Sequence, residues 1–195
     1  MNNVGIFLFN DVELLDYAGP YEVFSVTAQL NDHKLFKVFT VSEDGAAVRS
    51  VNGLTALPDF GFDNHPPIDI LVVPGGIGTR AAYKNEAVLD WVKSVAASAQ
   101  IVMSVCSGAR VLGAVALLDG QATVTHHSVI DHLRETAPAA IIDVEKRFTD
   151  NGKVMTSGGI SAGIDLALHV VAKLYGQDVA NKTIKYMEYG DWRSL

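Results

Sequence analysis

The chain has 195 residues, of which 49% are hydrophobic and 19% charged, so it can bury a sizeable core. A formal net charge of −7 with no run of Lys or Arg argues against a general role on nucleic acids or membrane surfaces. One cysteine excludes an intramolecular disulfide and a cysteine-rich metal site. With no signal peptide and no apolar stretch near the roughly 18 residues that span a bilayer, we expect a cytoplasmic protein.

Short apolar runs alternate with longer stretches of helical spacing. The expected strands are residues 4–9, 36–41, 68–73, 101–105, 122–124, 141–144 and 154–156. The expected helices are 17–30, with Pro20 near its start, then 86–98, 109–114, 127–135, 161–175 and 178–187. Residues 47–57, broken at Asn52-Gly53, predict a β-hairpin. We therefore expect an α/β fold in a single domain over 1–195, a flavodoxin-like three-layer sandwich with helices on both faces of a mainly parallel sheet.

Three of the expected turns leave the carboxyl ends of strands, where such sheets bind ligands. These turns are residues 10–16, 74–78 and 106–108. The topology predicts that they meet on one rim of the sheet.

Cys106 follows the buried strand 101–105 and directly precedes a helix, which predicts a sharp turn, or nucleophile elbow. Such a turn projects the side chain clear of the sheet, and the helix N-terminus favours a negative charge. We therefore expect a thiol pKa below the usual value of about 8.5. The alternative is a small buried hydrophobic residue, and the strand-turn-helix setting favours the nucleophile.

Glycines follow the strand 68–73 in the segment Pro74-Gly75-Gly76-Ile77-Gly78. Backbone N–H groups at Gly75 and Gly76, together with the N–H of Ser107, predict a site that binds an oxyanion or substrate, bordered by Ile77. A plain strand-to-helix turn is the alternative. A phosphate-binding loop is disfavoured, because no Gly-Lys-Ser/Thr follows.

Asp16 and His126 are the candidate acid and an auxiliary site residue. Asp16, flanked by apolar residues at a helix start, is either an N-cap or a partly buried carboxyl beside Cys106 with a raised pKa, able to donate a proton. His126 follows a strand and is either near Cys106 or a hydrogen-bonded structural residue. The side chains of the adjacent histidines 126 and 127 point in different directions, so no metal site is predicted. Residues 156–165, with glycines and a Ser cap, predict a tight helix start that closes the pocket floor or packs a dimer, and a nucleotide site is a weaker alternative.

Four segments in this order resemble the ThiJ/PfpI superfamily, of the class I glutamine amidotransferase-like fold. They are Asp16–Phe24, Val73–Gly76, Ser104–Ala109 and Thr156–Asp165. The chain is most similar to the isonitrile (isocyanide) hydratase branch, and the pattern also occurs in sensor domains of AraC-type regulators. Asp16, Cys106 and Ser107 match the Asp, Cys and hydroxyl positions of the hydratases, although Thr is more common than Ser at the third.

The resemblance implies a cysteine-dependent enzyme that hydrates an isocyanide to an N-substituted formamide. It implies a small-molecule substrate, a homodimer, and no metal or organic cofactor. Superfamily proteases carry His directly after Cys, so Ser107 argues against a protease; the glyoxalase branch uses Glu where Asp16 stands.

Three alternatives stay open. One is a ligand or redox sensor, disfavoured as a stand-alone regulator because no basic DNA-reading segment follows the last helix. Another is a glyoxalase-like enzyme acting on small aldehydes. The third is a redox role in which Cys106 is oxidised.

Overall fold

The computed structural model describes residues 1–195, and its centre is a six-stranded sheet in the order β2-β1-β5-β6-β10-β9. The strands are β1 (Asn2–Phe7), β2 (Phe36–Val41), β5 (Ile70–Val73), β6 (Ile101–Val105), β9 (Phe148–Asp150) and β10 (Val154–Ser157). All neighbours pair in parallel except β9, which is antiparallel to β10. The mainly parallel sheet is confirmed, and the edge strand β9 was missed because its sequence, Phe-Thr-Asp, has no apolar run.

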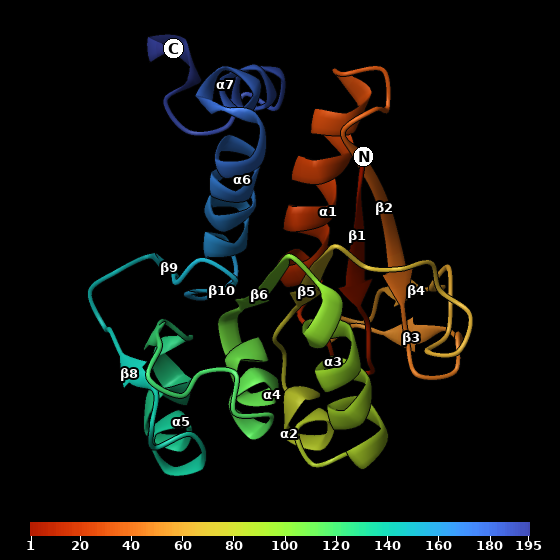
Figure 1. Ribbon diagram of the computed structural model, residues 1–195, viewed down its shortest axis with the longest axis vertical. Helices are drawn as coiled ribbons and strands as arrows, with labels where there is room; N and C mark the ends of the chain where they lie inside the picture. Colours follow the sequence, from red (N-terminus) through yellow and green to blue (C-terminus); the bar gives the residue numbers. More distant parts are fainter.

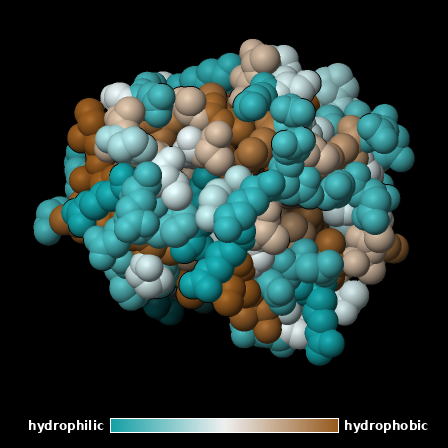
Figure 2. All heavy atoms as spheres, turned by 90° about the horizontal axis from the view of Figure 1, so that it is seen from below, coloured by the Kyte–Doolittle hydropathy of each residue, from teal (hydrophilic) through white to brown (hydrophobic).

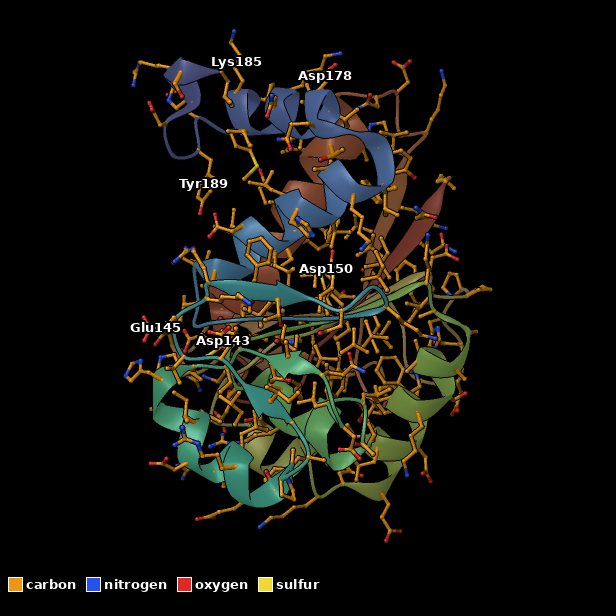
Figure 3. The ribbon with its side chains drawn as sticks, turned by 60° about the vertical axis from the view of Figure 1, so that its left-hand side comes forward. Asp143, Glu145, Asp150, Asp178, Lys185 and Tyr189 are labelled. Carbon is orange, nitrogen blue, oxygen red and sulfur yellow. The ribbon has the colours of Figure 1, made fainter.

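Helices cover both faces of this sheet. On one face lie α1 (Leu14–Gln29) and α6 (Ala162–Tyr175), with α7 (Gln177–Tyr186) packed on them. On the other face lie α2 (Thr79–Ala82), α3 (Glu86–Ser98), α4 (Ala109–Ala114) and α5 (Ile130–Thr136) (Figure 1). Figure 3 shows the strands crossing between these two groups of helices. The predicted three-layer arrangement is confirmed.

Two hydrophobic clusters fill the spaces between the layers, because successive strand side chains point to opposite faces. Ile6 and Met103 belong to the cluster under α1 and α6, whereas their neighbours Phe7 and Val102 belong to the cluster under α3 and α4. The strands β5 and β6, which are apolar except for Ser104, are thus buried on both sides, as expected of central parallel strands.

Smaller elements complete the fold. The predicted hairpin is confirmed as β3 (Val48–Arg49) and β4 (Thr55–Ala56), and β7 (Ala122–Thr123) pairs in parallel with β8 (Ile141–Ile142). Short 3₁₀ helices are η1 (Cys106–Gly108), η2 (His127–Val129) and η3 (Trp192–Ser194). No helix is both long and apolar enough to cross a bilayer. The face of the molecule below the sheet, formed by α2 to α5, is largely hydrophilic with separate apolar patches (Figure 2).

Helix α1 corrects one prediction. It begins at Leu14, three residues before the predicted start, and its N-cap is Glu13. Asp16 therefore lies in the first turn of the helix, and the N-cap alternative for this residue is wrong. The early start also leaves Pro20 inside the helix, in its second turn.

The three turns predicted to meet do so on one rim. The N–H of Glu13, in the β1–α1 turn, donates to the carbonyl of Gly75, in the β5–α2 turn, at 2.9 Å. The N–H of Gly76 in turn donates to Ser107 Oγ, after β6, at 2.9 Å. These bonds tie segments that are distant in the sequence into one small region.

Candidate active site

Cys106 occupies the nucleophile elbow between β6 and η1, with φ of 58°, a conformation that a non-glycine residue rarely adopts. Two bonds hold this strained residue: its N–H donates to the Gly158 carbonyl at 3.1 Å, and its carbonyl accepts from Thr125 Oγ1 at 2.8 Å. Gly108 permits the turn, since a Cβ there would lie 2.1 Å from the Val73 carbonyl oxygen. The sharp turn predicted from the sequence is confirmed.

Asp16 is completely buried and has no cationic partner. Its Oδ2 accepts from the Gly75 N–H at 2.9 Å, and its Oδ1 has no hydrogen-bond partner in the protein. Burial raises the pKa of Asp16 to about 7, and the nearby Glu13 carboxylate adds to the rise. The carboxyl therefore changes its protonation state near neutral pH.

Gly75 is the point at which the acid and the cysteine meet. A Cβ at this position would lie 2.7 Å from Asp16 Oδ2, 2.8 Å from Cys106 Cβ and 2.6 Å from the Ser107 nitrogen. The missing side chain of one glycine thus lets the carboxyl approach the nucleophile turn. The arrangement agrees with the expectation that Asp16 lies beside Cys106.

The pKa of the Cys106 thiol is raised, whereas the sequence predicted a lowered value. Burial raises the pKa of Cys106 well above its ordinary value, and the charge of Asp16 raises it further. Backbone N–H groups of Ser107 and Ile160 face the sulfur and act in the opposite direction, but desolvation outweighs them. Because Cys106 is only 7% exposed and α4 has just six residues, the helix terminus does not compensate for burial. The resting residue is a thiol.

Two of the backbone N–H groups expected to bind an oxyanion are bonded within the protein. The N–H of Gly75 is bonded to Asp16 and that of Gly76 to Ser107 Oγ, so neither is free to bind an oxyanion. Ser107 is buried, and its hydroxyl donates to the Gly76 carbonyl at 3.1 Å, which fixes the glycine turn. Of the three predicted N–H groups, only that of Ser107 lies beside the sulfur, and the N–H of Ile160 joins it there. The N–H of Ile160 was not predicted as part of the site. Ile160 has a φ of 50°, and the preceding pair Gly158-Gly159 is the one signal in the sequence for an unusual backbone there.

Cys106 opens into a cleft of about 330 Å³. The cleft is lined by Glu13, Gly76, Ile77, Arg80, Cys106, Ser107, Arg110, His126, Ser128, Val129 and Ile160. A larger hollow of about 430 Å³, near the carboxyl end of β1, contains none of the predicted site residues. The structure therefore brings Ile77, which is 55% exposed, and His126 to the wall of the cysteine cleft.

His126 is half-buried, with its Nδ1 accepting from the Ser128 N–H at 3.2 Å and its ring 4.2 Å from that of His127. Burial and the neighbouring His127 lower the pKa of His126. The side chain is thus both a structural group and part of the cleft wall, which combines the two alternatives considered for it.

Two arginines of the cleft, Arg80 and Arg110, were not predicted. Arg110 is the second residue of α4, four positions after Cys106, and lines the same cleft as the cysteine. An arginine within the otherwise apolar run Ala109–Ala114 is the signal that was available.

Comparisons with known proteins agree with this geometry. The sequence profile of the DJ-1/PfpI family matches residues 2–173. An isonitrile hydratase from Pseudomonas putida is 37% identical over 186 residues, covering 95% of this chain and 78% of the hydratase. The HTH-type transcriptional regulator GbdR from Pseudomonas aeruginosa is 28% identical over 178 residues, covering 91% of this chain but only 48% of the regulator.

Among solved structures, a ThiJ/PfpI family protein from Pseudomonas syringae superposes with a TM-score of 0.87 and 29% identity, covering 96% of this chain and 75% of that protein. The fold, the elbow cysteine and a family match over most of the length agree with one another. The chain belongs to the DJ-1/PfpI family.

Proposed function

We propose that this protein hydrates isonitriles, R–N≡C, to N-substituted formamides, R–NH–CHO, with Cys106 as nucleophile and Asp16 as proton carrier. The observation that carries the proposal is the meeting of a fully buried carboxyl and an elbow cysteine at Gly75. The 37% identity to an isonitrile hydratase over 95% of the chain supports this choice of reaction.

The first half of the mechanism joins sulfur and hydrogen to the same carbon. Because the pKa of Asp16 is raised to about 7, its carboxylate is available at neutral pH to take the proton of the Cys106 thiol. The sulfur attacks the terminal isonitrile carbon, and Asp16 returns the proton to that carbon. The S–H bond breaks, S–C and C–H bonds form, and the product is the thioimidate R–N=CH–S–Cys.

The second half releases the formamide. Water adds to the thioimidate carbon while the nitrogen gains a proton, and the C–S bond then breaks to give R–NH–CHO and the thiol. The N–H groups of Ser107 and Ile160 beside the sulfur stabilise the negative charge that develops as the thiol is deprotonated and as it leaves. This sequence of steps calls on no metal or organic cofactor.

An assay with an aryl isonitrile tests the proposal. We expect turnover by the wild type, its loss in Cys106→Ala, and a fall of about 10²–10⁴-fold in Asp16→Asn, since the proton carrier is removed. Asp131→Asn, a change of an exposed aspartate on α5, is the matched control and retains activity. Full activity in Cys106→Ala would end the proposal.

The pH dependence of kcat/KM adds a second readout. The reactive form of the Asp16–Cys106 pair carries one proton, and below a pH of about 7 it gains a second. We therefore expect kcat/KM to rise about tenfold per pH unit below that point and to level off above it. An activity that falls as pH rises from 5 to 7 contradicts this assignment.

A sensor is the second candidate, favoured by the match to a transcriptional regulator over 91% of this chain. Absence of turnover with isonitriles and methylglyoxal, together with oxidation of Cys106 at low peroxide concentration, supports it. Turnover of methylglyoxal alone supports an aldehyde-converting enzyme. The homodimer and the cytoplasmic location stay predictions, and sedimentation of the purified protein tests the first.

A further inference from the structure

Arg80 and Arg110 stand on the wall of the Cys106 cleft without a carboxylate partner. Neither forms any of the ion pairs of the molecule, in contrast to Arg134 and Arg147, which pair with Asp131 and Asp165. Arg110 is only 6% exposed, whereas Arg80 is exposed. A buried cation without a counter-charge is costly, and proteins usually pair it.

Neutral groups fix the Arg110 guanidinium in place. Its Nη1 donates to Thr79 Oγ1 at 3.1 Å, and its Nε donates to His132 Nδ1 at 3.3 Å. Burial and the Arg110 charge lower the pKa of His132, which keeps that ring neutral and able to accept. These contacts orient the guanidinium and leave its charge uncompensated.

One guanidinium nitrogen of Arg110 has no hydrogen-bond partner in the protein. This nitrogen, Nη2, donates to no protein group. It is not among the fully buried side-chain atoms without a partner, which are only Asp16 Oδ1 and Ser104 Oγ. Nη2 is therefore accessible to solvent, and the cleft is the cavity that Arg110 lines. One nitrogen of a pre-oriented guanidinium is thus free to bind a ligand beside the nucleophile.

The one acidic residue of the cleft wall does not neutralise this charge. Glu13 raises the pKa of Asp16 and opposes the lowering of the pKa of His126, whereas the largest charge effect on Arg110 comes from the positive Arg80. The cleft therefore has a cationic part at α2 and α4, separate from Glu13. A guanidinium with a free N–H and a second arginine nearby fits the two oxygens of a carboxylate.

We propose that the substrate carries a carboxylate, which Arg110 and Arg80 bind so that the reactive carbon lies at Cys106. This inference rests on the proposed hydratase function and names its substrate class, an isonitrile bearing an acid group a few bonds from the nitrogen. The cleft volume of about 330 Å³ suits a small molecule of this kind.

A matched pair of substrates tests the inference: isocyanoacetate and its uncharged methyl ester. We expect kcat/KM of the wild type to be about 10–100 times higher for the carboxylate, because a charge-assisted hydrogen bond is lost in the ester. Arg110→Met and Arg80→Met lower this ratio about tenfold and about threefold, and the effect lies mainly in KM. Lys185→Met, on α7 far from the cleft, removes the same charge and leaves the ratio unchanged (Figure 3).

Arg110→Lys keeps the charge, so we expect it to restore part of the acid-to-ester ratio of kcat/KM. Arg80 is exposed, so Arg80→Met can still be measured if Arg110→Met fails to fold. Equal turnover of the acid and the ester by the wild type, or ratios unchanged in both methionine variants, overturns the inference while the hydratase function stands.

Binding separates the two proposals. Cys106→Ala is titrated calorimetrically with isocyanoacetate, alone and combined with Arg80→Met. If the wild type hydrates neither compound but Cys106→Ala binds the carboxylate and Arg80→Met weakens that binding, the carboxylate site stands and the hydratase function falls. Absence of binding together with absence of turnover overturns both.

Discussion

Two aspartates of this molecule have opposite environments. Asp16, on the rim of the sheet beside Cys106, accepts one backbone hydrogen bond and has no cationic partner, and burial raises its pKa to about 7. Asp150, at the end of β9, accepts from His169 at 2.7 Å, from Lys173 at 2.8 Å and from the Gly152 N–H at 2.7 Å. Burial opposes its ionisation, but these donors prevail and lower the pKa of Asp150 to about 2.

The difference separates a group that favours folding from one that opposes it. Asp150 stabilises the fold as an anion, because it joins the edge strand β9 to α6 through His169 and Lys173. Asp16 costs stability as an anion, and its neighbour Cys106 is held at a strained φ of 58°. Groups that lower the stability of the fold and are held in place by the surrounding structure are typical of active sites.

Gly75→Ala is expected to have the largest effect, because its added methyl group lies where Asp16 and Cys106 meet. Its Cβ would lie 2.6 Å from the Ser107 backbone nitrogen, which cannot move without the elbow. We expect a loss of about 3 kcal/mol in unfolding free energy or more, and kcat/KM at least ~100-fold lower, since the reacting groups are displaced. Chemical denaturation and the isonitrile assay measure the two effects.

Gly158→Ala is the matched control. Its nearest neighbours would lie 3.6 Å or more from the new Cβ, an ordinary contact, and its φ is not in the left-handed region. We expect its unfolding free energy to change by less than about 1 kcal/mol. A Gly75→Ala protein as stable and active as wild type would show that the rim is more plastic than the structure indicates.

Asp16→Asn is expected to change how stability depends on pH. In the wild type the pKa of Asp16 rises from an ordinary 3.8 to about 7 on folding, so the folded state binds more protons between these values. The stability due to the protonated carboxyl is complete below pH 3.8 and is lost as pH rises towards 7. The wild type therefore loses up to roughly 4 kcal/mol relative to Asp16→Asn over this range.

Unfolding free energies of both proteins at pH 4, 5.5, 7 and 8 measure this difference. Asp131→Asn, with its exposed side chain on α5, controls for the loss of a carboxyl elsewhere and is expected to follow the wild type. A difference between wild type and Asp16→Asn that stays constant with pH would contradict a raised pKa.

Much of the fold was predictable because its signals are local. The bounds of α3 and β6 match the predictions at both ends, since Asn85 caps α3 and four of the five residues of β6 are apolar. The short edge strand β9 was not predictable in this way, because it depends on pairing with β10 rather than on its own residues. Local patterns thus indicated the layers, and tertiary pairing decided the edge.

For the candidate site, the sequence predicted which residues lie together but not their electrostatics. Strand ends placed Asp16, Gly75 and Cys106 on one rim, as parallel topology requires. The thiol pKa was predicted in the wrong direction, because sequence shows a helix start but not the depth at which the sulfur is buried. The role of the Ile160 N–H was equally hidden, since it depends on a backbone angle rather than a side chain.

Asp150→Asn is expected to have the smallest effect and to show the opposite pH dependence from Asp16→Asn. Its side chain is 21% exposed, so we expect the loss of its ionic contacts with His169 and Lys173 to cost about 1–2 kcal/mol at pH 7 and less in high salt. Because folding lowers the pKa of Asp150 from 3.8 to about 2, its contribution is complete above 3.8 and is lost as pH falls towards 2. Unfolding free energies at pH 7 and pH 3, at low and high salt, measure this. A destabilisation that does not shrink as pH falls from 7 to 3 would contradict a lowered pKa of Asp150.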